Sequence, residues 1–161
     1  SDGRNDTHII VRLERFGGRS MTTGGKLIVI EGPDNVGRSM HARLLRERLE
    51  AHGVAVAVVG LARSELLGDL IKRSHSDIHQ LNWRTRALLY ATDLHDQYIH
   101  EIQPLLEAGF VVIADRYTTT PLIREMVRGG DAAWIQGLYE SMPEADTTVV
   151  LLAGGRRACS S

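Results

Sequence analysis

The sequence has few of the features that secreted, membrane-spanning or strongly charged proteins show. It contains one cysteine, Cys159, in 161 residues, which excludes an internal disulfide framework. Its apolar runs, such as residues 54–59, have the length of a β-strand rather than of a membrane span. The formal net charge is -1, so no global field attracts nucleic acid or an anionic membrane. Because we also find no secretory signal, we expect a cytoplasmic protein with neither nucleic-acid nor membrane partners.

Length and composition are those of an ordinary globular domain. The chain is 43% hydrophobic and 24% charged, and 161 residues suffice for one domain with a real core. Residues 1–25 are more polar and richer in glycine than the rest, and Met21 is a candidate natural start. We therefore predict a domain over residues 26–161, preceded by a poorly ordered extension or expression remnant over residues 1–25.

From residue 26 onward, short apolar runs alternate with helical patterns. The pattern predicts strands at 27–30, 54–59, 110–114 and 147–152, and helices at 39–52, 64–73, 77–107 (disturbed near Pro104), 121–128 and 132–141. The strands are continuously apolar, as expected in a parallel sheet that is covered by helices on both faces. The sequence therefore predicts a three-layer α/β fold, whose ligands bind at the carboxyl ends of the strands.

The loop within IEGPDNVGRSM (residues 30–40) is typical of a phosphate-binding turn. Gly32 and Gly37 allow backbone N–H groups to point inward, and the following helix adds the partial positive charge of its N-terminus. Ser39 offers a hydroxyl to Mg²⁺. The lysine that completes this motif is replaced by Arg38, whose planar guanidinium keeps the charge but is wider than an ammonium group. The loop alone leaves two interpretations open, a phosphate site or a turn made for packing.

A second motif, FVVIADRYTTT (residues 110–120), places Asp115 and Arg116 at the carboxyl end of a predicted buried strand. A carboxylate there can hold Mg²⁺ through water, and the neighbouring arginine can grip a phosphate with two parallel hydrogen bonds. The alternative is a surface ion pair that ends a strand, which is common in proteins.

Together the two motifs resemble the thymidylate kinase family of P-loop nucleoside monophosphate kinases. The resemblance begins with KLIVIEGPDNVGRS, continues through LLYATDLHDQYIHEIQPLLEAGFVVIADRYTTT and ends with TTVVLL, so it covers most of residues 26–153. It implies a P-loop NTPase fold, a place in nucleotide biosynthesis, and transfer of the γ-phosphoryl group of ATP to dTMP with Mg²⁺. It also implies a homodimer.

The resemblance assigns roles to individual positions. Arg38, Asp115 and Arg116 take the catalytic positions, with Arg116 as the clamp on the acceptor phosphate. Ser39 and Asp115 take the Mg²⁺ positions. The acceptor-binding positions are Asp34, Tyr90 (stacked on the base), Arg116 and Thr120. The ATP-binding positions are Gly32, Asn35, Val36, Gly37, Arg38, Ser39 and Met40.

The sequence also departs from the family pattern. Leu94 replaces an arginine that hydrogen-bonds the thymine base, and Arg124-Glu125 replaces a Tyr-Gln pair. The family's Arg-Glu-Pro segment is replaced by GLARSE, in which Arg63 is a loosely aligned substitute. The family's arginine-bearing lid, fifth strand and last helix have no counterpart before Ser161.

These departures leave three hypotheses. The leading one is a nucleoside monophosphate kinase that resembles thymidylate kinase. The second is a catalytically degenerate homologue that binds nucleotide or a partner without turnover, because phosphoryl transfer depends on well-placed positive charge. The third is a kinase for another small phosphate acceptor, since Leu94 cannot make the hydrogen bond that reads thymine.

Overall fold

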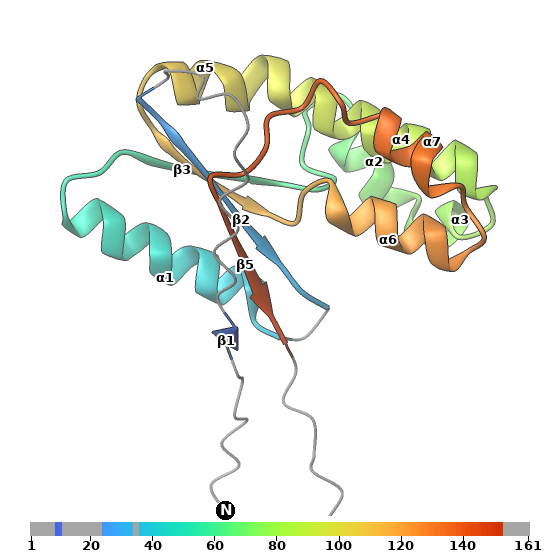
Figure 1. Cartoon of the computed structure of the whole chain (residues 1–161), viewed down its shortest axis with the longest axis horizontal. Coiled ribbons are helices and arrows are strands. Elements are labelled where there is room, and N and C mark those ends of the chain that lie inside the picture. Colours follow the sequence, from blue (N-terminus) through green and yellow to red (C-terminus); the bar gives the residue numbers. More distant parts are fainter. Residues whose placement is uncertain (1–8, 11–23, 34–35, 153–161) are drawn as a thin grey trace, which may run out of the picture.

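The computed structural model describes residues 9–10, 24–33 and 36–152. Strands and helices alternate along the chain as the apolar pattern predicts (Figure 1). The strands are β1 (Ile9–Ile10), β2 (Lys26–Glu31), β3 (Val56–Gly60), β4 (Val111–Asp115) and β5 (Thr147–Leu151). The helices are α1 (Arg38–Ala51), α2 (Gly68–Arg73), α3 (His75–Ile78), α4 (Trp83–Gln97), the π-helix η1 (Tyr98–Ile102), α5 (Gln103–Glu107), α6 (Thr119–Val127) and α7 (Ala132–Gly137).

The strands form one sheet in the order β1-β5-β2-β4-β3. Strands β5, β2, β4 and β3 are parallel, which confirms the predicted α/β fold. Strand β1 is an addition that the sequence pattern did not predict, and it pairs antiparallel with the outer edge of β5. The register places Ile30 opposite Asp115, and Asp115 opposite Gly60. The ends of the three strands β2, β4 and β3 therefore meet at one edge of the sheet.

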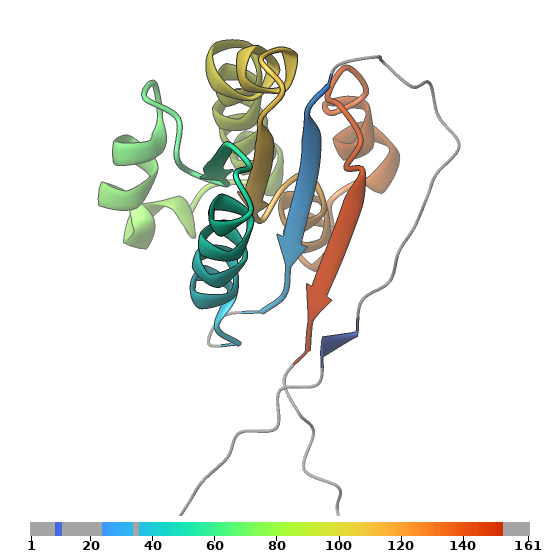
Figure 2. The same cartoon turned by 90° about the vertical axis from the view of Figure 1, so that its left-hand side faces the viewer.

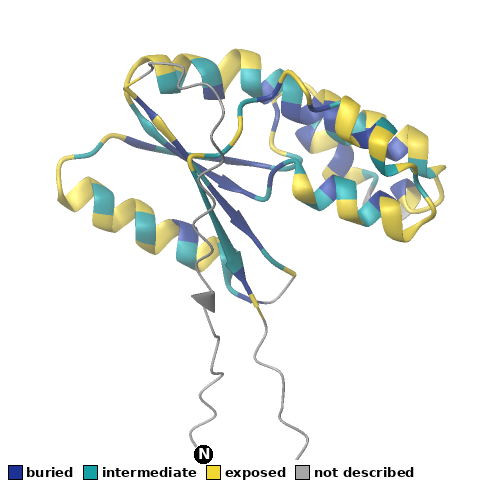
Figure 3. Ribbon diagram, viewed as in Figure 1, coloured by how far each residue is buried: buried dark blue, intermediate teal, exposed yellow. Residues whose placement is uncertain are grey.

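Helices cover both faces of the sheet, with α1 on one face and the run from α4 to α6 on the other (Figures 1 and 2). Successive strand residues point to opposite faces, so strands β2, β3 and β4 each contribute to two cores. Val112 and Ala114 pack with Leu94 of α4, whereas Ile113 packs with Ala42 of α1. The buried residues line the sheet and the helix faces turned towards it (Figure 3).

The predicted helix over residues 77–107 is divided. Its main part begins at Trp83, where the Asn82 side chain accepts a hydrogen bond from the backbone N–H of Arg84. The five residues of η1 then precede Pro104, which has no N–H to continue the α-helical pattern. The predicted disturbance near Pro104 is therefore confirmed. No helix in the described part of the chain has the length and apolar character of a membrane span.

Candidate functional site

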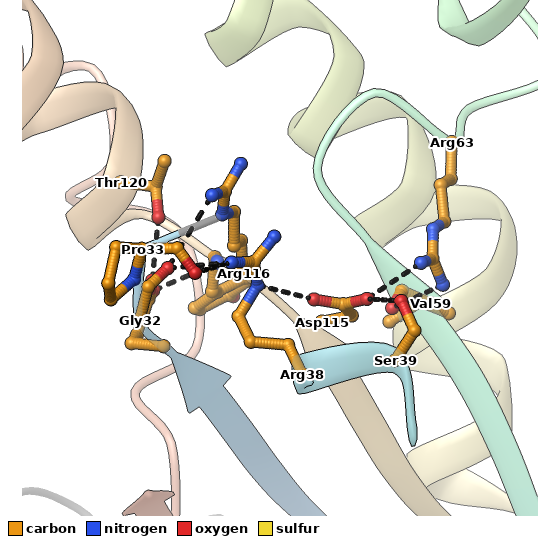
Figure 4. Close-up of polar contacts among 11 residues, drawn as sticks. Gly32, Pro33, Arg38, Ser39, Val59, Arg63, Asp115, Arg116 and Thr120 are labelled. Atoms are coloured by element: carbon orange, nitrogen blue, oxygen red, sulfur yellow. Dashed lines mark hydrogen bonds and ion pairs between the residues drawn. The ribbon is translucent and has the colours of Figure 1, made fainter. Parts of the chain in front are cut away.

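The site is built where strands β2, β4 and β3 end and their loops begin (Figure 4). The β2 strand leads into the glycine loop and α1, β4 leads into Arg116, and β3 leads into the loop of residues 61–67. Gly32 has a φ of 153° and Gly37 a φ of 78°, and both values favour glycine. The glycines of the motif therefore shape the turn between strand and helix.

Asp115 is the centre of the hydrogen-bond network. Its Oδ1 accepts a bond from Nε of Arg38 at 3.0 Å, and its Oδ2 accepts bonds from Oγ of Ser39 at 3.2 Å and Nη2 of Arg63 at 2.9 Å. The Asp115 side chain is only 6% exposed, so these contacts replace most of its hydration. Two cations and a hydroxyl therefore hold one carboxylate in a fixed orientation.

Arg38 also bonds the loop in which it stands. Its Nη1 donates to the carbonyl oxygen of Gly32 at 2.8 Å and to that of Pro33. The side chain is 13% exposed and bridges the start of the loop and the end of β4. Only a forked guanidinium can make these bonds together with the Nε bond to Asp115, since an ammonium group presents its donors from one nitrogen. Arg38, which replaces the lysine of the motif, thus makes hydrogen bonds that a lysine could not make together.

Arg116 has a backbone φ of 64°, which a residue with a side chain rarely adopts. Such a conformation costs about 1–3 kcal/mol and persists only where surrounding contacts impose it. Here the Arg116 backbone N–H donates to the carbonyl of Ile30 at 2.9 Å, and its Nη2 lies 3.5 Å from the carbonyl of Gly32. The strained backbone turns the Arg116 side chain towards the glycine loop.

Glu31 links the glycine loop to the start of α6. Its Oε1 accepts a bond from the backbone N–H of Tyr117 at 3.0 Å, and its Oε2 accepts one from Oγ1 of Thr120 at 2.6 Å. Burial raises the pKa of the Glu31 carboxyl above its usual value, against the opposing effects of these bonds and of the charges of Arg116 and Arg38. Sequence reasoning missed this residue, because one glutamate at the end of an apolar run carries no distinctive signal.

A cavity of about 760 Å³ opens beside these groups. Arg116 and Thr120 line it, as do Glu31 and Arg124. Tyr90 is not among its lining residues, and it lies half-buried on α4. The cavity therefore joins two of the predicted acceptor-binding residues and leaves the predicted base-stacking residue outside.

The other predicted residues occupy the loop and the first turn of α1. Val36 is buried, whereas Met40 is 49% exposed. Asp34 and Asn35 lie outside the described residues. Leu94 is fully buried in the core between α4 and the sheet. Arg63, which aligned only loosely with the family pattern, is brought directly to Asp115.

The oxygen atoms of Ser39 and Asp115 suit Mg²⁺. Magnesium prefers hard oxygen ligands and keeps several waters or phosphate oxygens in its shell. Ser39 Oγ and Asp115 Oδ2 lie 3.2 Å apart, so one ion can contact both groups directly or through water. Arg63 binds the same Asp115 oxygen and would have to share it with the ion.

A glycine loop between a buried parallel strand and a helix, with a hydroxyl beside the carboxylate of the neighbouring strand, defines the P-loop class of α/β proteins. The comparisons with known proteins specify the class further. The family model described as "Thymidylate kinase" matches residues 30–154. The chain belongs to the thymidylate kinase family.

Relatives and a solved structure agree with this assignment. The chain is 39% identical over 115 residues to "Probable thymidylate kinase 2" of Saccharolobus solfataricus, covering 71% of this chain and 53% of that protein. It is 33% identical over 132 residues to "Probable thymidylate kinase" of Pyrococcus horikoshii, covering 79% of this chain and 64% of that protein. The crystal structure of thymidylate kinase from Ehrlichia chaffeensis has the same fold, with a TM-score of 0.67, 22% identity, and coverage of 76% of this chain and 70% of that one. The chain thus spans between half and two thirds of the length of these two relatives.

Proposed function

We propose that this protein is an ATP-dependent nucleoside monophosphate kinase that transfers the γ-phosphoryl group of ATP to dTMP or a related monophosphate. The observation that carries the proposal is the placement of Arg38, Arg63 and Arg116 around Asp115 and the glycine loop, in a chain of the thymidylate kinase family. Phosphoryl transfer depends on positive charge and alignment around the transferred group, and this cluster offers both.

In this proposal the ATP phosphates lie on residues 32–40, and the backbone N–H groups of the loop and the N-terminus of α1 bind them. Arg38 neutralises charge on the transferred group, and Arg116 holds the acceptor phosphate in line. Mg²⁺, bound by Ser39 and Asp115 together with the phosphates, supplies further neutralisation of their oxygens. Thr120 contacts the acceptor from the cavity wall, and the family pattern assigns a second contact to Asp34. Tyr90 lies outside this cavity, so its predicted stacking on the base requires the base to extend beyond the cavity towards α4.

The identity of the acceptor base depends on contacts other than Leu94. Leu94 is apolar and fully buried, so it offers no hydrogen bond to thymine. Arg124 lines the cavity beside Arg116 and Thr120, where it can contact the acceptor. We therefore propose an acceptor range that includes dTMP but is not restricted to it by a thymine-reading arginine.

We also propose that the protein works as a cytoplasmic homodimer. The supporting feature is a mainly apolar stripe along α4 and η1, which contains Leu88, Ala91 and Thr92 of α4 and Ile99 of η1, with Leu66 beside it. Leu88, Ile99 and Leu66 are 46%, 58% and 62% exposed. A symmetric dimer uses one self-complementary surface on both subunits, and this stripe provides such a surface.

The test is Mg²⁺-dependent formation of ADP from ATP, with dTMP and then with a panel of other nucleoside monophosphates. Arg116→Ala should lower kcat/KM for the acceptor by about 10²–10³, as expected when one well-placed donor is removed. Arg46→Ala, on the exposed face of α1, is the matched control and should leave the rate unchanged. ATP binding without turnover for any acceptor would instead identify a degenerate homologue.

A further inference from the structure

Two of the buried polar side chains of helix α4, Asp93 and Gln97, have no part in the proposed reaction. Asp93 is fully buried and Gln97, one turn later, is 1% exposed. Polar groups are placed in such a position only where they are hydrogen-bonded, because burying them without partners is costly. Their partners are found on the segment that leaves β3, residues 60–64.

The two side chains bind the backbone of this segment at alternate residues. The two carboxylate oxygens of Asp93 accept bonds from the backbone N–H of Ala62 at 2.7 Å and of Ser64 at 3.0 Å. Gln97 donates from Nε2 to the carbonyl of Gly60 at 2.6 Å and to Asp93 at 3.0 Å, and its Oε1 accepts from the Gly60 N–H at 3.3 Å. Every donor to Asp93 in this set is a neutral N–H group.

The bound segment has an unusual backbone. Ala62 has a φ of 60°, which a residue with a side chain seldom adopts without external support. Gly68 packs closely beneath it, because a Cβ at Gly68 would lie 3.0 Å from the Ala62 carbonyl oxygen. Leu61 is held from the other side by a backbone bond to the carbonyl of Asp115 at 3.3 Å.

Arg63 stands between the two residues whose backbone N–H groups Asp93 binds, and its guanidinium lies beside Asp115 (Figure 4). Its Nη2 lies 2.9 Å from Oδ2 of Asp115, although the side chain is 37% exposed. An exposed arginine is usually free to sample many rotamers. Here the fixed backbone on both sides of Arg63 limits where its guanidinium can lie.

We propose that Asp93 and Gln97 are positioning residues that hold residues 60–64 so that the guanidinium of Arg63 faces the phosphates of the substrates. The role of Arg63 towards phosphate rests on the proposed function. Only a carboxylate at position 93 can make both bonds to the loop, since each of its two oxygens accepts a hydrogen bond from a backbone N–H group. An amide there would present an NH₂ group to a backbone N–H and leave both without an acceptor.

Asp93→Asn should lower kcat/KM for the monophosphate by up to about 10²-fold, as expected when a substrate-positioning side chain is displaced by about 1 Å. The decisive comparison is with Arg63→Ala. If Asp93 acts through Arg63, the double variant is no slower than Arg63→Ala alone. A merely structural role predicts that Asp93→Asn slows the Arg63→Ala enzyme by the same factor as it slows the wild type, and this result would overturn the proposal.

The matched control is Asp96→Asn, on the same helix, because the Asp96 carboxylate pairs with His100 and not with the loop. A second readout is hydrogen exchange of residues 61–64, followed by mass spectrometry, which needs no turnover. Exchange should rise in Asp93→Asn and stay at the wild-type rate in Asp96→Asn, whereas unchanged exchange in both contradicts the proposal. Gln97→Met keeps the two bonds between Asp93 and the loop, so it should raise exchange less than Asp93→Asn does. It replaces Asp93→Asn in this experiment if that variant does not fold. If the wild type shows no turnover but the exchange rates of the variants differ as expected, the proposed function is refuted and the role of Asp93 in holding the loop is not.

Discussion

Among the described residues, the guanidinium of Arg38 donates to oxygens of Asp115, Gly32 and Pro33. Each bond that it makes within the protein competes with a bond to phosphate. A lysine side chain ends in a compact ammonium that cannot span these acceptors, and so it is freer to approach the β- and γ-phosphates. The contacts of Arg38 order the loop, and Arg38 must exchange some of them for phosphate oxygens when it neutralises charge on the nucleotide.

We expect Arg38→Lys to raise kcat about tenfold, which corresponds to about 1.4 kcal/mol of transition-state stabilisation. The same change removes protein hydrogen bonds worth about 1 kcal/mol each and should lower the Tm by a few degrees. Steady-state kinetics and thermal denaturation measure the two effects. Arg38→Ala is the control and should slow turnover. If Arg38→Lys slows turnover as much as Arg38→Ala does, the forked guanidinium itself is needed.

Glu31 should make the free energy of unfolding depend on pH in a way that one substitution can remove. Burial raises the pKa of its carboxyl above the ordinary value of 4.5, so the folded protein holds this proton more tightly than the unfolded chain does. The free energy of unfolding should therefore fall as the pH rises from about 4.5 through the raised pKa. Glu31→Gln should remove this part of the pH dependence, measured by thermal denaturation between about pH 4 and 8. Glu47→Gln, on the exposed surface of α1, should keep it; a Glu31→Gln curve parallel to the wild type would contradict the assignment.

At the level of single residues, the sequence predicts positions better than contacts. Ser39 and Asp115 were expected at the same edge, and the strand register brings them together. The bonds of Arg38 to its own loop were not predictable, because a side-chain conformation depends on all of its neighbours. Arg63 lies in a loop whose backbone N–H groups donate to Asp93, about 30 residues further along the chain. No spacing rule within the loop contains that information.

Between helices α4 and α6 lies an ion pair that the sequence pattern did not reveal. Arg86 donates from Nε at 3.0 Å and from Nη2 at 2.5 Å to Oε1 of Glu125. The two side chains are 3% and 0% exposed, and among the described residues Nη1 of Arg86 and Oε2 of Glu125 have no hydrogen-bond partner. Burial has removed the hydration of both groups, and their mutual hydrogen bonds replace it only in part. The ion pair therefore contributes little net stability, although removing one partner alone is costly.

We expect Glu125→Ala to lower the free energy of unfolding by about 3–5 kcal/mol, since it leaves a buried charge without its partner. The double variant Arg86→Met/Glu125→Leu should be close to the wild type or more stable, because apolar groups of similar volume need no hydration. Urea denaturation of the single and double variants measures both values. The exposed pair of Arg46 and Glu50 is the control, and its removal should cost at most about 1 kcal/mol. A double variant as unstable as Glu125→Ala would show that the pair itself stabilises the fold.

At the level of elements, the sequence predicted which segments are helices and strands but not all of their limits. The helix over residues 64–73 was expected to begin at Ser64, yet α2 begins at Gly68, after a turn in which the Ser64 hydroxyl accepts a bond from Leu67. Serine favours turns and helix caps alike, so its presence does not distinguish them. Strand β1 has only two residues and gains its order from pairing with β5, which no local pattern encodes.

The molecule as a whole presents two kinds of surface at the helical side of its sheet. The cavity beside Arg116 is lined by charged and apolar groups together, as suits a ligand that is part phosphate and part base. The outer stripe of α4 is mainly apolar and offers no comparable charge cluster. We therefore propose the first surface for substrates and the second for a partner subunit. The two surfaces share no lining residue, so each can be changed alone.

The stripe on α4 and η1 suits an antiparallel pairing of two copies of this continuous helical run. Leu88 and Ile99 are eleven residues, about 16 Å, apart, so Leu88 of each copy can meet the partner's Ile99. We expect the wild type to sediment near twice 17.8 kDa and Leu88→Glu/Ile99→Glu to sediment as a monomer, because each charge would be buried in the interface. Leu44→Glu, an equally exposed leucine on α1 at the other face of the sheet, should remain a dimer. A monomeric wild type, or a dimer that survives both charges, would exclude this surface as the dimer interface.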